Sequence, residues 1–299
     1  MISLMYLITL LIMIGIYALA TLGLNITMGY AGQVNLGQAA FLGIGAFTSA
    51  ILTTRYGVSF WLALPIAGVI ALSIGILIGM VSIRLKQDFL AITTIGFNFI
   101  VVAIFLYYDF FGGSYGIINI PRPTIFGHII KGVWYMLLVW IVLILAMYFN
   151  YWMGKSWLGR ALRALKEDED AAESMGIDVK KYKIIAFSLG AFFAGLAGSL
   201  LAHFKTYIVW SDFEFSVSVM LLTMCILGGM ESIYGPLVGA SIVIFLPEIF
   251  RPLMDYRLLM YAVFLLLLLK YMPNGIIGRG SYLERKLRAY YSGEDAHEG

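Results

Sequence analysis

Charged residues are scarce in this chain of 299 residues: they make up 12% of it, whereas hydrophobic residues make up 61%. So few charges cannot cover the surface of a water-soluble globule of this length. The sequence therefore predicts an integral membrane protein. The formal net charge of +3 comes without a basic stripe interleaved with aromatic residues, so we expect no nucleic-acid partner.

Cysteine and histidine are also rare. The chain has one cysteine, Cys225, which excludes an intramolecular disulfide and a cysteine metal cluster. The three histidines, His128, His203 and His297, are far apart in the sequence and form no metal-ligand motif. We therefore expect no metal site.

Catalytic and energy-coupling motifs are missing as well. The sequence has no GxxxxGKS/T phosphate loop and no HExxH, which argues against an ATPase and a zinc protease. The long apolar stretches carry no central Asp, Glu, Lys or Arg of the kind that secondary transporters use to couple ions. The sequence therefore predicts a non-enzyme without a cofactor, whose energy comes from elsewhere.

Apolar stretches dominate what is present. A helix needs roughly 20 apolar residues to cross a bilayer. Clean candidates lie near residues 3–24, 60–83, 89–108, 132–153, 184–204 and 256–273, and shorter, glycine-rich ones lie near 36–53, 215–230 and 235–250. We predict an all-α, multi-pass bundle of eight or nine transmembrane helices, in which the short segments are broken or re-entrant.

Lysine and arginine predict the orientation, because they collect in cytoplasmic loops. Cations cluster in three places: Arg84 and Lys86; the segment 154–183; and the tail after residue 278. With nine crossings and the N-terminus outside, all three clusters lie in the cytoplasm. We predict one membrane domain over residues 1–278 and a basic, then disordered, cytoplasmic tail over 279–299.

A glycine-rich stretch, "GYAGQVNLGQAAFLGIGAF", begins at Gly29 between two apolar runs. Its glycines allow a bend or a close helix contact, and its amide side chains can satisfy backbone groups where a helix is broken. The stretch is therefore either a packing node or the polar wall of a translocation path. The candidate residues are Gly29, Gly32, Gln33, Asn35, Gly37 and Gln38.

A second such stretch, "GGMESIYGPLVGA", begins at Gly228. It predicts a turn between two apolar segments, with Gly228 and Gly229 at the break and Glu231 hydrated at the cytoplasmic face. Thr94 and Asn98 form a polar line on the segment 89–108, and Asn98 is the better path candidate because a threonine can bond back to its own helix.

The polar segment 154–183 predicts two short helices. Ala161, Leu162, Ala164 and Leu165 recur at helical spacing, and the acidic run that starts at Glu167 suits the first turn of a second helix. Gly176 suits its C-terminal stop. We expect this second helix to present Ala171, Ala172 and Met175 on one small apolar face. Such a face fits a groove on a partner, although a solvated charged loop has the same composition.

The stretch "GRALRALKEDEDAAESMGID" resembles the cytoplasmic coupling loop of ATP-binding-cassette (ABC) importer permeases. Together with the two glycine-rich stretches, it resembles the permease family for branched-chain amino acids, and the LivM type more than the LivH type. The similarity extends from about Tyr17 to about Gly278 and implies a second homologous permease, two ATPase subunits that use ATP and Mg, and an extracytoplasmic binding protein. The coupling residues implied are Arg160, Arg163, Ala164, Glu167, Asp168, Ala171, Ala172, Met175 and Gly176.

The resemblance implies an importer of branched-chain or other hydrophobic amino acids in the prokaryotic cytoplasmic membrane. A path without charges would equally pass urea or a short amide, which related systems carry. A stand-alone secondary transporter or channel is a further alternative, but it has no need of the predicted coupling helix.

Overall fold

The structure is a computed structural model that describes residues 4–83, 85, 87–125, 127–249, 270 and 275–278. Its long or apolar helices are α1 (Leu4–Leu24), α2 (Gln38–Thr54), α3 (Phe60–Ser82), α4 (Gln87–Tyr107), α5 (Val133–Lys155), α8 (Val179–Lys205), α9 (Phe215–Gly228) and α10 (Gly235–Ile249). Six helical stretches in the described chain are long and apolar enough to cross a membrane, and α2 and α10 are shorter apolar helices. The helical membrane fold is thus confirmed.

The number of crossings stays a prediction. The ninth predicted span, near residues 256–273, lies outside the described residues apart from Lys270. Arg84, Lys86 and the tail over 279–299 also lie outside them, so the predicted domain boundary after residue 278 is untested.

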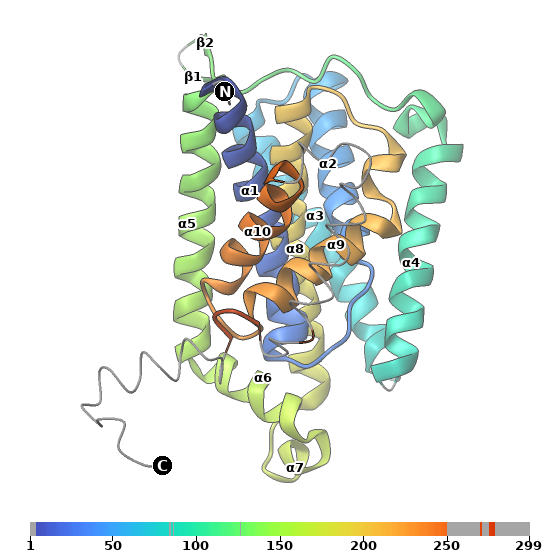
Figure 1. Cartoon of the computed structure of the whole chain (residues 1–299). Helices are drawn as coiled ribbons and strands as arrows, with labels where there is room; N and C mark the ends of the chain where they lie inside the picture. Colours follow the sequence, from blue (N-terminus) through green and yellow to red (C-terminus); the bar gives the residue numbers. More distant parts are fainter. Residues whose placement is uncertain are drawn as a thin grey trace, which may run out of the picture.

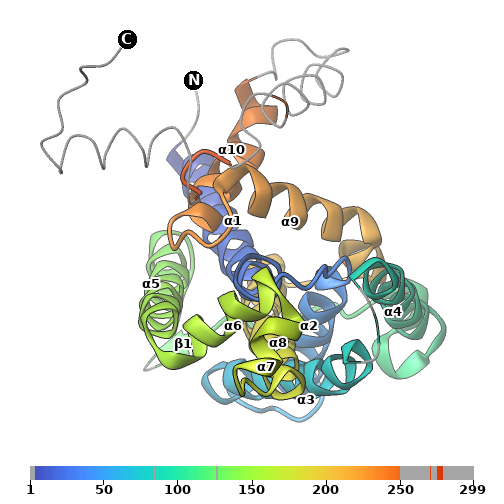
Figure 2. The same cartoon turned by 90° about the horizontal axis from the view of Figure 1, so that it is seen from below.

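The helices form a bundle with α1 and α8 at its centre (Figures 1 and 2). In the most apolar stretch of each helix, 72% of α8 is buried inside the protein, whereas only 28% of α3 and of α4 is buried. Seen along the bundle, α5 and α4 lie on opposite sides of this centre (Figure 2). Large apolar side chains such as Phe99 and Ile141 are exposed on these outer helices, as a lipid environment requires.

Small residues on α8 allow the central packing. Ala194, Ala197 and Gly198 are among the buried residues of α8, and they recur every three or four positions, so they face the neighbouring helices together. Small side chains let helix backbones approach closely where lipid supplies no hydrophobic driving force. The glycine and alanine content of α8 thus accounts for its central place.

The two ends of the bundle differ. At one end, the polar segment folds into α6 (Trp157–Glu167) and α7 (Glu169–Ser174), at the bottom of Figure 1. At the other end, the α4–α5 connection contains the 3-10 turns η2 (Asp109–Phe111) and η3 (Gly113–Tyr115) and a hairpin in which β1 (Thr124–Ile125) pairs antiparallel with β2 (His128–Ile129). A further 3-10 turn, η4 (Trp210–Phe213), precedes α9.

Two helices extend beyond their predicted bounds. The predicted first span ends near residue 24, but the chain continues as a π-helix, η1 (Asn25–Tyr30), before it leaves the helical path. A π-helical turn widens the helix and often marks a functional position. Helix α8 begins at Val179 because the Asp178 carboxylate accepts a hydrogen bond from the backbone N–H of Lys181.

Candidate functional site

The predicted pair of short helices is confirmed, with shifted bounds. Glu167 ends α6 instead of starting the second helix, and Asp168 is the N-cap of α7, where its Oδ1 accepts a hydrogen bond from the Ala171 N–H at 2.9 Å. Gly176 follows α7 with a φ of +83°, as expected of a helix stop. Glu169 and Asp170 lie in the first turn of α7, where the positive end of the helix dipole stabilises their carboxylates.

The predicted small apolar face of α7 is wrong in one residue. Ala171 and Met175 are exposed, and Met175 has 83% of its surface exposed, but Ala172 is buried at 2%. Neighbouring residues on a helix point about 100° apart, so Ala172 turns toward the protein while Ala171 points away from it. The exposed surface of α7 therefore contains Ala171 and Met175 without Ala172.

An ion pair fixes α7 against the start of α8. The Lys183 Nζ lies 2.6 Å from the Glu169 Oε2, and the Lys183 side chain is only 6% exposed. A nearly buried ammonium group needs such a partner. This ion pair thus links α7 to α8, the central helix of the bundle.

Glu231 makes a second ion-pair cluster at the same end of the molecule. Its carboxylate lies 2.5 Å from the Lys166 Nζ and 3.9 Å from the Arg163 Nε, and its side chain is 14% exposed. The expectation of a simply hydrated Glu231 is therefore wrong. The carboxylate instead pairs with the two cations of α6. The sequence did not show this pairing, because Lys166 and Glu231 are 65 residues apart.

Asn25 joins this cluster to the π-helix η1. Its Oδ1 accepts a hydrogen bond from the Glu231 N–H at 2.9 Å, and its Nδ2 donates one to the Ser232 carbonyl at 3.0 Å. A Cβ at Gly29 would lie 2.2 Å from the Asn25 Oδ1, so only glycine leaves room for this contact. Helix α6, the α9–α10 turn and η1 thus meet at one point.

The arginines of α6 hold it to the end of α5. Arg163 donates from its Nη2 to the Gly154 carbonyl at 2.6 Å and lies over the Tyr30 ring at 5.4 Å. Arg160 donates to the Lys155 carbonyl at 3.1 Å. Ala164, also expected in the coupling region, is partly buried on α6.

The first glycine-rich break is closed by side-chain hydrogen bonds. The backbone N–H groups at the start of α2 have no helical partner, and three N–H groups there bond to side chains, two of which come from other helices. The donor–acceptor pairs are Leu36 N–H with Thr94 Oγ1 at 3.0 Å, Gly37 N–H with Asn35 Oδ1 at 2.9 Å and Ala39 N–H with Ser218 Oγ at 2.9 Å. The predicted role of polar side chains at a broken helix is confirmed for Asn35.

Gln38 and Asn98 are also bonded and fully buried. Gln38 donates to the carbonyls of Ala20 and Gly190, at 3.1 and 3.2 Å, and accepts from the Asn35 Nδ2 at 2.9 Å. Asn98 donates to the Phe213 carbonyl at 3.1 Å and accepts from the Ser218 hydroxyl at 2.9 Å. Gln38 and Asn98 thus hold neighbouring segments together in this conformation. Their role in lining a translocation path stays a prediction.

Gln33 differs from its neighbours. It is 3% exposed, and neither its Nε2 nor its Oε1 has a hydrogen-bond partner in the described part of the chain. An unpaired buried amide is costly. Gln33 is therefore the candidate in the first break whose hydrogen bonds this conformation leaves unmade.

The second break is closed mainly by the backbone. Helix α9 ends at Gly228, where a Cβ would lie 1.8 Å from the Gly235 carbonyl oxygen. The N–H groups of Ile276 and Ile277 donate to the carbonyls of Leu227 and Gly228, at 2.9 and 3.1 Å. The predicted turn between two apolar segments is confirmed.

Several residues of these clusters were missed in the sequence. Lys166 counted only as an orienting cation, and Asn25 and Ser218 were single polar residues in apolar runs. At the opposite end, buried His203 donates from its Nδ1 to the Pro121 carbonyl at 2.6 Å, so its Nε2 accepts from the Ser49 hydroxyl at 2.9 Å. For Asn25, Ser218 and His203, a polar residue in an apolar run was the available signal, whereas nothing distinguished Lys166 from the other cations of its polar segment.

Metal binding finds no support in these clusters. Within the ranges that the structure describes, no group of three or more His, Cys, Asp or Glu residues is arranged to hold a metal ion. The chemistry of the site is thus that of ion pairs and hydrogen bonds at helix ends.

Comparisons with known proteins identify a family for this chain. Residues 6–271 match the family model described as branched-chain amino acid transport system / permease component. The chain is similar to the high-affinity branched-chain amino acid transport system permease protein LivM of Escherichia coli K12, at 34% identity over 88% of this chain and 68% of that protein.

Relatives with lower sequence identity are also branched-chain amino acid transport permeases by name. They include a probable LivM permease of Methanocaldococcus jannaschii, at 26% identity over 88% of this chain and 90% of that protein. The LivH permease of Escherichia coli K12 is 27% identical over 88% of this chain and 91% of that protein. No solved structure shows a significant match. The chain therefore belongs to the family of branched-chain amino acid transport system permease components.

Proposed function

We propose that this chain is the membrane-spanning permease subunit of an ABC importer for branched-chain or other hydrophobic amino acids. An extracytoplasmic binding protein delivers the substrate, and the working assembly holds a second homologous permease and two ATPase subunits. The permease itself hydrolyses nothing and uses no cofactor, because ATP and Mg belong to the ATPases. The names of the relatives support this assignment over a urea or amide carrier.

The observation that carries the proposal is the connection of the α6–α7 loop to the helix bundle. The exposed Ala171 and Met175 offer a small apolar surface that fits a groove on an ATPase. Behind that surface, Glu169 pairs with Lys183 on α8, and Lys166 pairs with Glu231 beside the η1 helix. Closure of the ATPases would therefore move α8 and both glycine-rich breaks together.

Orientation and path complete the proposal. The chain lies in the prokaryotic cytoplasmic membrane. Because the α6–α7 end carries the cations that favour the cytoplasm, this end and the C-terminus lie inside. The path runs along the two breaks, where Gln33 has unmade hydrogen bonds that a polar substrate group can complete. A path without full charges suits an amino acid whose own two charges cancel.

A pull-down tests the proposal first. The tagged chain is extracted from its native membrane in mild detergent, and we expect an ATPase pair and a second permease to be recovered with it. Recovery of the chain alone, with transport activity in liposomes, would favour a stand-alone carrier.

Ala171→Arg tests the docking surface. A long cation does not enter a groove sized for alanine, so we expect the ATPases to be lost from the pull-down and uptake to be abolished, while the level of the permease in the membrane is unchanged. Ala171→Ser is the matched control, because it keeps the side chain small and should keep uptake. Normal uptake by Ala171→Arg would refute the coupling role of α7.

A further inference from the structure

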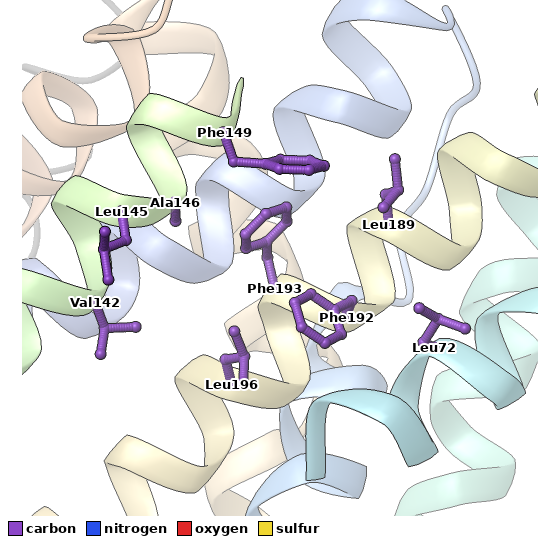
Figure 3. Close-up of a pocket in the computed structure, with 9 residues that line it drawn as sticks. All are labelled: Leu72, Val142, Leu145, Ala146, Phe149, Leu189, Phe192, Phe193 and Leu196. Carbon is purple, nitrogen blue, oxygen red and sulfur yellow. The ribbon is translucent and has the colours of Figure 1, made fainter. Parts of the chain in front are cut away.

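An apolar groove of about 400 Å³ lies between α3, α5 and α8, outside the clusters described above (Figure 3). Residues from all three helices line it, among them Leu72, Leu145, Phe149, Leu189, Phe192 and Leu196. Leu145 is 63% exposed, so the groove opens on the surface of the bundle. At this depth of a membrane protein, that surface faces hydrocarbon.

Aromatic side chains lie between the groove and the α6–α7 end, on the groove-facing sides of α5 and α8. On α5, Trp152 lies one turn beyond Phe149 and is 64% exposed. On α8, Tyr182 lies seven residues before Leu189, which is two turns on the same face. The Trp157 Nε1, at the start of α6, donates to the Tyr182 hydroxyl at 2.9 Å, so this aromatic pair joins α6 to α8 about 10 Å beyond the groove.

One cation lies at this aromatic pair and a second lies next to the first. The Arg160 guanidinium is 5.8 Å from the Trp157 ring centroid and donates to the Lys155 carbonyl at 3.1 Å, and the Lys155 Nζ lies over the Tyr151 ring at 4.1 Å on the exposed side of α5. Neither cation pairs with a carboxylate in the part of the chain that the structure describes. Aromatic side chains of this kind mark the interface between hydrocarbon and headgroups, where cations attract lipid phosphates.

We propose that this groove and its cationic rim form a binding site for an anionic phospholipid. One acyl chain lies along Phe149, Leu189 and Phe192, and the phosphate lies beside Lys155 and Arg160. A groove that was merely apolar would hold any lipid chain, but the unpaired cations add selectivity for negative charge. The site requires only that α5 and α8 span the membrane, so it holds whatever the chain transports.

Photolabelling tests this site in the intact transporter. The full complex is placed in nanodiscs with phosphatidylglycerol or phosphatidylcholine that carries a diazirine on one acyl chain, and labelled peptides are identified by mass spectrometry. We expect phosphatidylglycerol to label residues 142–149 and 189–196 more strongly than phosphatidylcholine does. Lys155→Gln should lower the phosphatidylglycerol labelling about fivefold and leave the phosphatidylcholine labelling unchanged.

A second pair of variants separates the groove from the general lipid surface. Leu189→Trp should fill the groove and remove the label for both lipids, whereas Ile100→Trp, on the exposed face of α4, should leave it unchanged. Equal labelling by the two lipids in the unmodified protein would overturn the proposal. It would also be overturned if the groove were labelled in the isolated chain but protected in the complex, because a helix of another subunit would then cover it.

Discussion

The two glycine-rich breaks both interrupt helices, but different contacts close them. In the break before α2, side chains from distant helices, such as Thr94 and Ser218, satisfy the free N–H groups inside the bundle. In the break between α9 and α10, the backbone of 276–277 closes the turn, and a charged side chain, Glu231, reaches out to α6. One break is thus held by neutral hydrogen bonds and the other by close backbone contacts and ion pairs.

The two breaks also differ in how firmly each is held. The neutral network around Gln38 is fully buried and ties α1, α2 and α8 together, so it is part of the central packing. The Glu231 cluster sits at helix ends and joins three separate elements through few contacts. We expect variants in the first break to affect folding, and variants in the second to separate folding from coupling.

The largest effect is expected at Gly228, one of the two glycines of the described chain with the closest backbone contacts. Gly228→Ala places a Cβ 1.8 Å from the Gly235 carbonyl oxygen and should destabilise the protein by about 3 kcal/mol. Gly96→Ala, where a Cβ meets nothing within 4 Å, is the matched control and should change stability by less than about 1 kcal/mol. Denaturation in mixed micelles measures both, and equal stability of the two variants would refute the tight turn.

A matched pair of glutamines sharpens the reading of the first break. Gln38→Leu removes three hydrogen bonds and leaves the Asn35 Nδ2 without its acceptor, so it should cost about 1–3 kcal/mol of stability. Gln33→Leu removes no bond in this conformation and should keep stability, yet it should lower substrate uptake if Gln33 meets the substrate. Unfolding in micelles and uptake in vesicles distinguish the two, and full uptake by Gln33→Leu would exclude its path role.

A smaller loss of stability than in Gly228→Ala, and the clearest effect on coupling, is expected at Glu231. Glu231→Gln weakens the ion pairs with Lys166 and Arg163 and should cost about 1–2 kcal/mol, because the cluster is partly exposed to solvent. Uptake should fall further than stability does, since α6 loses its charged link to the α9–α10 turn. The swap of Lys166→Glu with Glu231→Lys should restore part of the uptake, and its failure to do so would argue against the link.

Local sequence signals predicted much of the fold. Runs of apolar residues located eight helices of the described chain to within a few residues, and Gly176 and the acidic run located the second short helix. The π-helix η1 was missed because Asn25 and Thr27 interrupt an apolar run without a proline or a charge to mark a change. The burial of Ala172 was missed because a helix of six residues has no periodicity long enough to show which face is covered.

The sequence alone shows that this protein is a helical membrane protein. It also shows where glycine-rich segments interrupt the helices and which loop is polar, because hydropathy, glycine and charge act over neighbouring residues. Only the tertiary structure decided which polar groups meet. Glu231 finds Lys166 across 65 residues, and Asn25 finds Ser232 across 207. Such pairs depend on helix packing, which brings helix ends together independently of their distance along the chain.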